Sequence, residues 1–151
     1  MTKYICIIIT LATFVTDSWA LTVKHYSLEG LSKDSPFIVR AKCTAIAFGN
    51  ESGIEKKIYR FEIHEVIKGN FGKKNIELKV LKNAEKLRLV PSIEISDEAV
   101  LFLSATLKIK GITQGYLKLH EDIKTKKRLT SYENTSYTYE ALKKIITSYT
   151  Q

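Results

Sequence analysis

From residue 37 onward, apolar and polar side chains alternate along the chain with a period of two. The apolar positions of the first run are Val39, Ala41, Cys43, Ala45 and Ala47. Between them lie Arg40, Lys42 and Thr44. Every second side chain of an extended strand lies on the same face, so the pattern predicts a half-buried strand over 37–48. Cys43 belongs to the apolar face, which predicts a buried structural cysteine and not a reactive one.

Four later segments carry strand patterns as well, and turn-forming residues separate several of them. The segments are 58–67, 76–81, 98–103 and 108–119. The first places Tyr59, Phe61 and Ile63 on one face, and the third is a continuous apolar run, typical of a strand buried on both sides. The last contains Gly111 and Gly115, and glycines within a strand favour sharp bends such as barrel corners.

The two ends of the mature chain favour helical turns. Residues 27–35 predict a short helical turn or an irregular lead-in, whereas the C-terminal segment switches to helical spacing. With Thr138 as N-cap, Leu142, Ile146 and Tyr149 fall on one face of an amphipathic helix over about 137–149. The chain is therefore predicted to be mainly β, a small five- to six-stranded OB-like barrel with a C-terminal amphipathic helix. A β-sandwich fits the same pattern.

The first 20 residues have the pattern of a cleavable signal peptide. Lys3 supplies a positive start, an apolar run covers 4–15, and small residues lead to Ala20. The run is shorter than the roughly 20 residues that a membrane-spanning helix needs. We therefore expect cleavage after Ala20, a single mature domain over 21–151 without a transmembrane segment, and a secreted or periplasmic location.

Composition and charge fit a folded, basic domain. Hydrophobic residues make up 44% of the chain and charged residues 26%, which argues against disorder. The formal net charge is +8, and it is unchanged after signal removal because one base (Lys3) and one acid (Asp17) are lost. Such a charge attracts anionic partners, although it also serves solubility alone. Cys43 is the only cysteine of 21–151, so we expect no internal disulfide.

A cluster of cations is the candidate binding site. It consists of Lys124, Lys126, Lys127 and Arg128, in a segment predicted to be a loop. Four cations in five residues repel one another and remain solvated unless an acidic protein surface, an anionic glycan or a lipid surface meets them. The alternative is an ordinary charged loop.

Part of the chain resembles netrin-like domains. The similarity is carried by DSPFIVRAK at 34–42 and IYRFEIHEVIKG at 58–69, which look like the first strands of that superfamily. Pro91, Asp97-Glu98, the Leu-Phe-Leu run at 101–103 and the GITQG segment at 111–115 resemble exported bacterial proteins of similar build. The resemblance covers roughly 27–121.

This resemblance implies an OB-type barrel, the fold of the tissue inhibitors of metalloproteinases. Those inhibitors act through an N-terminal cysteine, whereas the mature chain has no cysteine before Cys43. The inhibitory device is therefore missing, and fold kinship alone does not carry function.

The sequence predicts no catalytic, metal or cofactor site. His25, His64 and His120 are scattered, none at metal-ligand spacing with another ligand, and no nucleophile elbow or phosphate loop is present. Nucleic acid is disfavoured because Tyr59 and Phe61 are predicted to face the core. We expect a monomeric, exported, non-enzymatic binding module that contacts a protein or an anionic partner. The alternative is an inhibitor or accessory factor of an exported hydrolase.

Overall fold

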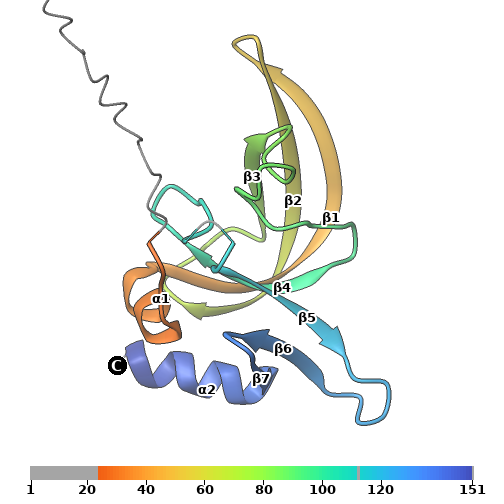
Figure 1. Cartoon of the computed structure of the whole chain (residues 1–151). Coiled ribbons are helices and arrows are strands. Elements are labelled where there is room, and N and C mark those ends of the chain that lie inside the picture. Colours follow the sequence, from red (N-terminus) through yellow and green to blue (C-terminus); the bar gives the residue numbers. More distant parts are fainter. Residues whose placement is uncertain (1–23, 112, 151) are drawn as a thin grey trace, which may run out of the picture.

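The computed structural model describes residues 24–111 and 113–150 (Figure 1). The predicted signal peptide, 1–20, lies outside the described residues. The strands are β1 (Phe37–Glu51), β2 (Ile54–Lys68), β3 (Asn75–Leu81), β4 (Glu98–Leu103), β5 (Tyr116–Glu121), β6 (Arg128–Tyr132) and β7 (Thr135–Thr138). The helices are α1 (Leu28–Asp34) and α2 (Tyr139–Thr150). The prediction of a mainly β chain with a C-terminal helix is confirmed.

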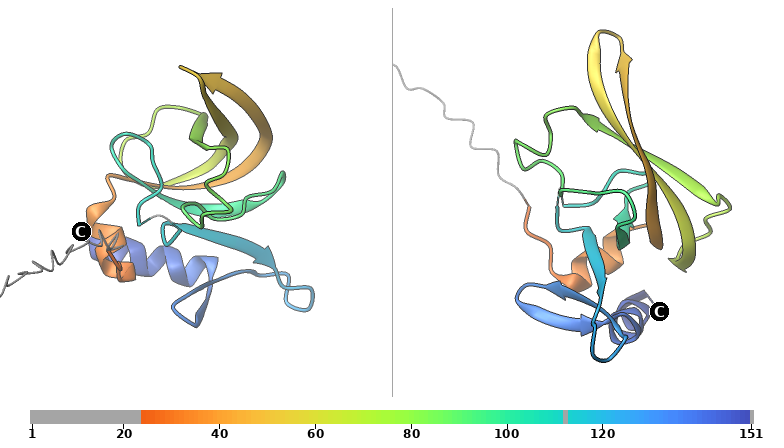
Figure 2. Two further views of the ribbon diagram at one scale, coloured as in Figure 1. Left: turned by 45° about the horizontal axis from the view of Figure 1, so that its top comes forward. Right: turned by 90° about the vertical axis from the view of Figure 1, so that its right-hand side faces the viewer.

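The strands form one antiparallel sheet in the order β3-β2-β1-β4-β5-β6-β7. The predicted OB-like barrel of five to six strands is not confirmed, because seven strands of the described chain form an open sheet. β5 pairs with β4 along one edge and with β6 at His120 and Glu121 along the other, and no pairing joins it to β3. β1 and β2 extend beyond the other strands as a long curved hairpin (Figure 2).

Hydrophobic cores lie on both faces of the sheet. One face buries Val39, Cys43 and Phe61 together with apolar side chains of β3 and β4. The other face packs against both helices, which lie side by side beneath the sheet in Figure 1. β4 contributes to both cores, and its residues from Ala99 to Leu103 are fully buried. This confirms the prediction of a strand covered on both sides.

The alternation predicted for β1 holds up to Cys43 and then shifts. Cys43 pairs with Phe61 and Ala45 pairs with Arg60, so Thr44 is an extra residue, a β-bulge. Beyond the bulge Ile46 packs against the first core, in place of the predicted Ala45 and Ala47. The predicted burial of Cys43 is confirmed, and burial raises the pKa of its thiol.

Two predicted features of the second half differ from the structure. Within 108–119 only the part from Tyr116 forms a regular strand, while the preceding residues form tight turns. A Cβ at Gly115 would lie 2.5 Å from the carbonyl oxygen of Lys110, and Gly111 has φ +60°. These glycines therefore serve a compact turn and not a barrel corner. The β6–β7 hairpin was not predicted; its turn places Glu133 and Asn134 at positive φ.

The predicted ends of both helices agree with the structure to within two residues. In α1 the backbone N–H of Gly30 donates to Ser27 Oγ at 3.1 Å. In α2 the N–H of Ala141 donates to Thr138 Oγ1 at 3.3 Å, as expected of an N-cap. Leu142 and Ile146 are fully buried against the sheet. The C-terminal helix thus covers one face of the sheet with part of the predicted apolar side, whereas Tyr149, predicted on the same side, is exposed in its last turn.

Candidate functional site

Three of the four predicted cations, Lys124, Lys126 and Lys127, lie in the turn between β5 and β6, whereas Arg128, also predicted to lie in a loop, is the first residue of β6. Asp122 organises this turn. Asp122 Oδ1 accepts hydrogen bonds from the backbone N–H groups of Lys124 at 2.7 Å and Thr125 at 3.1 Å. These amide hydrogen bonds, that of Thr125 first, hold the pKa of Asp122 below its ordinary value. The backbone N–H of Asp122 donates to Lys127 O at 2.9 Å, and that of Lys126 donates to Asp122 O at 2.8 Å. We call residues 122–127 the hairpin loop.

The hairpin loop and the start of α2 enclose a groove of about 510 Å³. Its lining residues are Glu121, Lys126, Lys127, Arg128, Thr138, Tyr139 and Glu140. Three of the four predicted site residues thus line one groove, while Lys124 lies elsewhere on the loop. We call this space the cationic groove, although two carboxylates belong to its wall.

The four cations differ in how well they are paired. Arg128 Nε lies 3.2 Å from Glu98 Oε2, and Lys126 Nζ lies 3.8 Å from Glu121 Oε1. Lys124 and Lys127 form no ion pair with any residue in the described part of the chain. Ile123, which directly precedes Lys124, leaves 86% of its surface exposed. The loop therefore presents two unpaired positive charges beside an uncovered apolar side chain.

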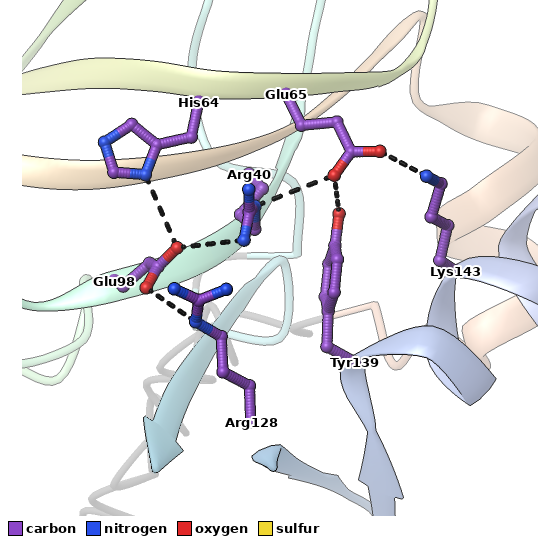
Figure 3. A network of polar contacts seen from close by, with 7 residues as sticks. All are labelled: Arg40, His64, Glu65, Glu98, Arg128, Tyr139 and Lys143. Atoms are coloured by element: carbon purple, nitrogen blue, oxygen red, sulfur yellow. Dashed lines mark hydrogen bonds and ion pairs between the residues drawn. The ribbon is translucent and has the colours of Figure 1, made fainter. Parts of the chain in front are cut away.

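A network of polar side chains lies behind the cationic groove and shares Arg128 and Tyr139 with it (Figure 3). Glu98 lies at its centre. Its Oε1 is 3.4 Å from Arg40 Nη1 and 3.5 Å from His64 Nδ1. Glu98 Oε1 accepts no hydrogen bond within the described chain. The network connects β1, β2, β4 and β6.

The second carboxylate of the network, Glu65, holds α2. It accepts a hydrogen bond from the Tyr139 hydroxyl at 2.5 Å and another from Lys143. Arg40 Nε lies 3.7 Å from Glu65, and the Arg40 guanidinium lies 4.9 Å from the centre of the Tyr139 ring, within cation–π range. One short segment of β2 is thereby connected to two successive turns of α2.

Opposing influences act on the pKa of Glu65. Burial by itself raises the pKa, but hydrogen bonds from Lys143 and Tyr139 and the positive charge of Arg40 outweigh it. The pKa of Glu65 therefore lies below its ordinary value of 4.5. Burial and the same hydrogen bond raise the pKa of Tyr139, so the phenol remains protonated and donates. The arrangement stabilises an ionised carboxylate beneath α2.

A β-bulge explains how consecutive residues of β2 reach the same network. Arg40 pairs with Glu65 and Ala41 pairs with Ile63, so His64 is the extra residue. In a regular strand His64 and Glu65 would point to opposite faces. Here both side chains join the network, His64 toward Glu98 and Glu65 toward Tyr139 (Figure 3). Of this network the sequence predicted only Arg128 as a site residue, and it placed none of Arg40, His64, Glu65, Glu98, Tyr139 and Lys143 in one cluster. No short-range pattern reports a bulge of this kind.

The other candidate residues remain apart. His25 lies 3.3 Å from Glu133, and His64 belongs to the network. Within 24–111 and 113–150, no three His, Cys, Asp or Glu side chains gather where they could hold a metal ion. In the same residues no helix is both long and apolar enough to cross a membrane.

Comparisons with models of known protein families and with curated proteins find no match to this chain. Its function has to be argued from its own geometry.

Proposed function

We propose that the chain is an exported, non-enzymatic binding module that docks an acidic protein surface on the hairpin loop and the cationic groove. The observation that carries the proposal is the fixed loop with unpaired cations. Lys124 and Lys127 have no carboxylate partner in the described chain, yet the Asp122 hydrogen bonds hold the backbone between them. A preorganised loop loses less conformational entropy on binding than a flexible one.

An apolar anchor among the cations supports a protein partner. Ile123, with 86% of its surface exposed, extends from the same loop. Protein interfaces commonly combine a buried apolar anchor with a charged rim. The loop offers both within six residues.

The mixed charge of the cationic groove favours a protein over a uniform polyanion. Glu121 and Glu140 line the groove together with Lys126, Lys127 and Arg128. These two carboxylates weaken the attraction of the groove for a uniform polyanion such as a nucleic acid, an anionic glycan or an anionic bilayer. A protein surface that is acidic overall can place its own donors against them while its carboxylates meet the lysines.

The fold and location within this proposal are those that the sequence suggests. Export follows from the signal-like segment 1–20, and the netrin-like resemblance implies an OB-type relationship. The order β3-β2-β1-β4-β5 supports that relationship, since it is the order of a five-stranded Greek-key barrel opened between β3 and β5. A determination of the N-terminal residue of the exported chain tests the expected start at Leu21.

The binding proposal is tested by affinity capture from envelope and extracellular extracts with residues 21–151. Three baits are compared: the parent, a loop variant with Lys124→Ala and Lys127→Ala, and a control with Lys73→Ala and Lys74→Ala. Lys73 and Lys74 are exposed, lie between β2 and β3, and form no ion pair in the described chain. The two double variants lose the same net charge, so the comparison separates local from overall attraction.

The proposal predicts a partner captured by the parent and by the control, and lost by the loop variant. That partner should carry a predominantly acidic surface. Equal capture by all three baits would place the contact elsewhere and overturn the proposal. The absence of any specific partner at low salt would do the same.

A further inference from the structure

The edge of the sheet at β3 is open and regular. β3 pairs only with β2, and its register from Asn75 to Leu81 contains no bulge. Ile63 N–H donates to Lys74 O, and Lys82 N–H donates to Glu55 O. In an antiparallel pair such hydrogen-bonded positions alternate with positions whose backbone groups point away from the partner. The even-numbered residues of β3 therefore bond to β2, and the odd-numbered residues face outward.

Backbone hydrogen-bonding groups are consequently unused along this edge. The N–H and C=O groups of Glu77 and Lys79 point away from β2, and no other backbone group of the described chain bonds to them. Leu81 O already accepts a hydrogen bond from the N–H of Ala84 at 2.9 Å. An edge of this kind is a template for a further strand.

An apolar groove of about 490 Å³ runs along the same edge. One side is formed by β3, and the other by Leu89 and Val90 together with the turn that contains Leu107 and Ile109. Leu81 leaves 45% of its surface exposed at this groove. A peptide lying against β3 would therefore find backbone partners on one side and apolar side chains on the other, the two components of strand addition.

Positive charge surrounds this groove. Lys56, Lys79 and Lys108 line it, and Lys56 and Lys108 form no ion pair in the described chain. The single acidic residue of the wall, Glu77, is already paired with Arg60 at 2.9 Å. A second copy of this chain is disfavoured because each copy carries a formal net charge of +8. Charge complementarity points to an acidic occupant.

We propose that the open edge of β3 is a docking site for an extended, acidic peptide segment of another protein, which adds to the sheet as a strand. Its backbone pairs with Glu77 and Lys79. Every second side chain of the peptide is apolar and enters the groove beside Leu107 and Ile109. The carboxylates of the intervening peptide residues form ion pairs with Lys56 and Lys108. This site lies at the β3 edge of the sheet, whereas the hairpin loop joins β5 and β6, so it adds to the proposed function and does not depend on it.

The test uses two synthetic decapeptides, acetyl-(Val-Glu)5-amide and acetyl-(Val-Lys)5-amide, added to residues 21–151. Binding is followed by NMR chemical shifts and by amide hydrogen exchange of Glu77 and Lys79. We expect the glutamate peptide to bind and to slow both amides about tenfold when roughly nine-tenths of the protein is occupied. The lysine peptide should bind at least about tenfold more weakly.

The Lys79→Pro variant removes one outward N–H without removing a bond to β2, and proline is tolerated at such an edge position. Its affinity for the glutamate peptide should fall about tenfold, the cost of one hydrogen bond. The matched control, Lys79→Ala, keeps the N–H and should lose less than about threefold. Should Lys79→Pro fail to fold, the double variant Lys56→Glu, Lys108→Glu is expected to reverse the preference between the two peptides.

Several outcomes would overturn this proposal. Two concern the peptides: equal binding of both, or no binding of the glutamate peptide. A third is that the NMR chemical-shift changes are confined to residues 122–127. The fourth is slowed amide exchange of Glu77 and Lys79 that depends on protein concentration in the absence of peptide. The Lys124→Ala, Lys127→Ala variant should bind the glutamate peptide at β3 within about twofold of the parent. Failure of the hairpin-loop proposal is thereby distinguished from failure of this one.

Discussion

Replacement of Glu65 by glutamine tests whether the polar network fastens α2 to the sheet. The carboxylate accepts hydrogen bonds from Tyr139 and Lys143 and lies near Arg40. Glutamine has nearly the same shape but no charge, so the phenol of Tyr139 keeps a neutral acceptor while the charge-assisted part of each interaction is lost. The perturbation is therefore electrostatic and leaves the packing of α2 intact.

The magnitude follows from the exposure of each partner. Tyr139 is almost fully buried, so weakening its bond to a charged acceptor should cost about 1 to 1.5 kcal/mol. The Lys143 side chain is 40% exposed, so solvent screens its ion pair and the loss of that pair adds little. We expect Glu65→Gln to lower the free energy of unfolding by about 1 to 2 kcal/mol at neutral pH.

The effect should depend on pH with a definite sign. The pKa of Glu65 in the folded protein lies below its ordinary value of 4.5. Its contribution is therefore complete above that pH and is lost as the pH falls through the folded pKa. Glutamine does not titrate, so the difference in unfolding free energy between parent and variant should shrink as the pH is lowered below 4.5.

Urea unfolding followed by circular dichroism measures both quantities. At about pH 7 the unfolding midpoint should fall by about 0.5 to 1 M with an unchanged m-value. The control is Glu62→Gln, also on β2, because Glu62 is exposed and forms no ion pair in the described chain. This control should change the free energy of unfolding by no more than about 0.5 kcal/mol. A Glu65→Gln effect no larger than that of the control, or a gap that persists unchanged at low pH, would refute the reasoning.

Three further changes probe other parts of the structure. Gly69→Ala should destabilise the chain by about 1 to 3 kcal/mol in urea unfolding, because φ is +87° and the new Cβ would lie 2.4 Å from Pro36 O; an unchanged midpoint would contradict this account. Phe102→Ala should cost about 3 to 5 kcal/mol, since the side chain is fully buried beneath the helices; a loss below 1 kcal/mol would contradict its place in the core. Asp122→Ala should speed the amide hydrogen exchange of Lys124 at least about tenfold and change the free energy of unfolding by less than about 1 kcal/mol. An unchanged exchange rate would show that Asp122 does not fix the loop.

Local patterns were sufficient to predict the elements that obey a single period. Tyr59 and Phe61 lie in the core as their alternation requires, and the apolar run from Ala99 forms a strand buried on both faces. Leu142 and Ile146 cover the sheet from a helix that begins after Thr138. In each case the periodicity and the burial have the same cause, a regular backbone with one apolar side.

Irregular backbone and long-range pairing limited the rest of the prediction. The bulge at Thr44 changes which side chains of β1 face the core, and the bulge at His64 turns Glu65 toward α2. The hairpin of β6 and β7 turns at Glu133 and Asn134 without a glycine, which weakened its local signal. Whether the sheet closes depends on pairing of β3 with a distant strand, which alternation within either strand does not report.

The candidate site was predicted in part. The cationic cluster was visible as a run of like charges, and three of its members do line one groove. The partners that determine which cations stay free, such as Glu98 for Arg128, lie far away in the chain. Only the fold shows that Lys124 and Lys127 remain without an ion pair in the described residues.

The measurement that tests the central claim most directly is the dissociation constant of the captured partner for two charge-reversal variants. One carries Lys124→Glu and Lys127→Glu, and the other, with the same net charge, carries Lys73→Glu and Lys74→Glu. Binding through the hairpin loop predicts a loss of about 100-fold or more for the first and only a few-fold for the second, with both differences shrinking at high salt. Equal affinities of the two variants would contradict the assignment of the partner to the hairpin loop.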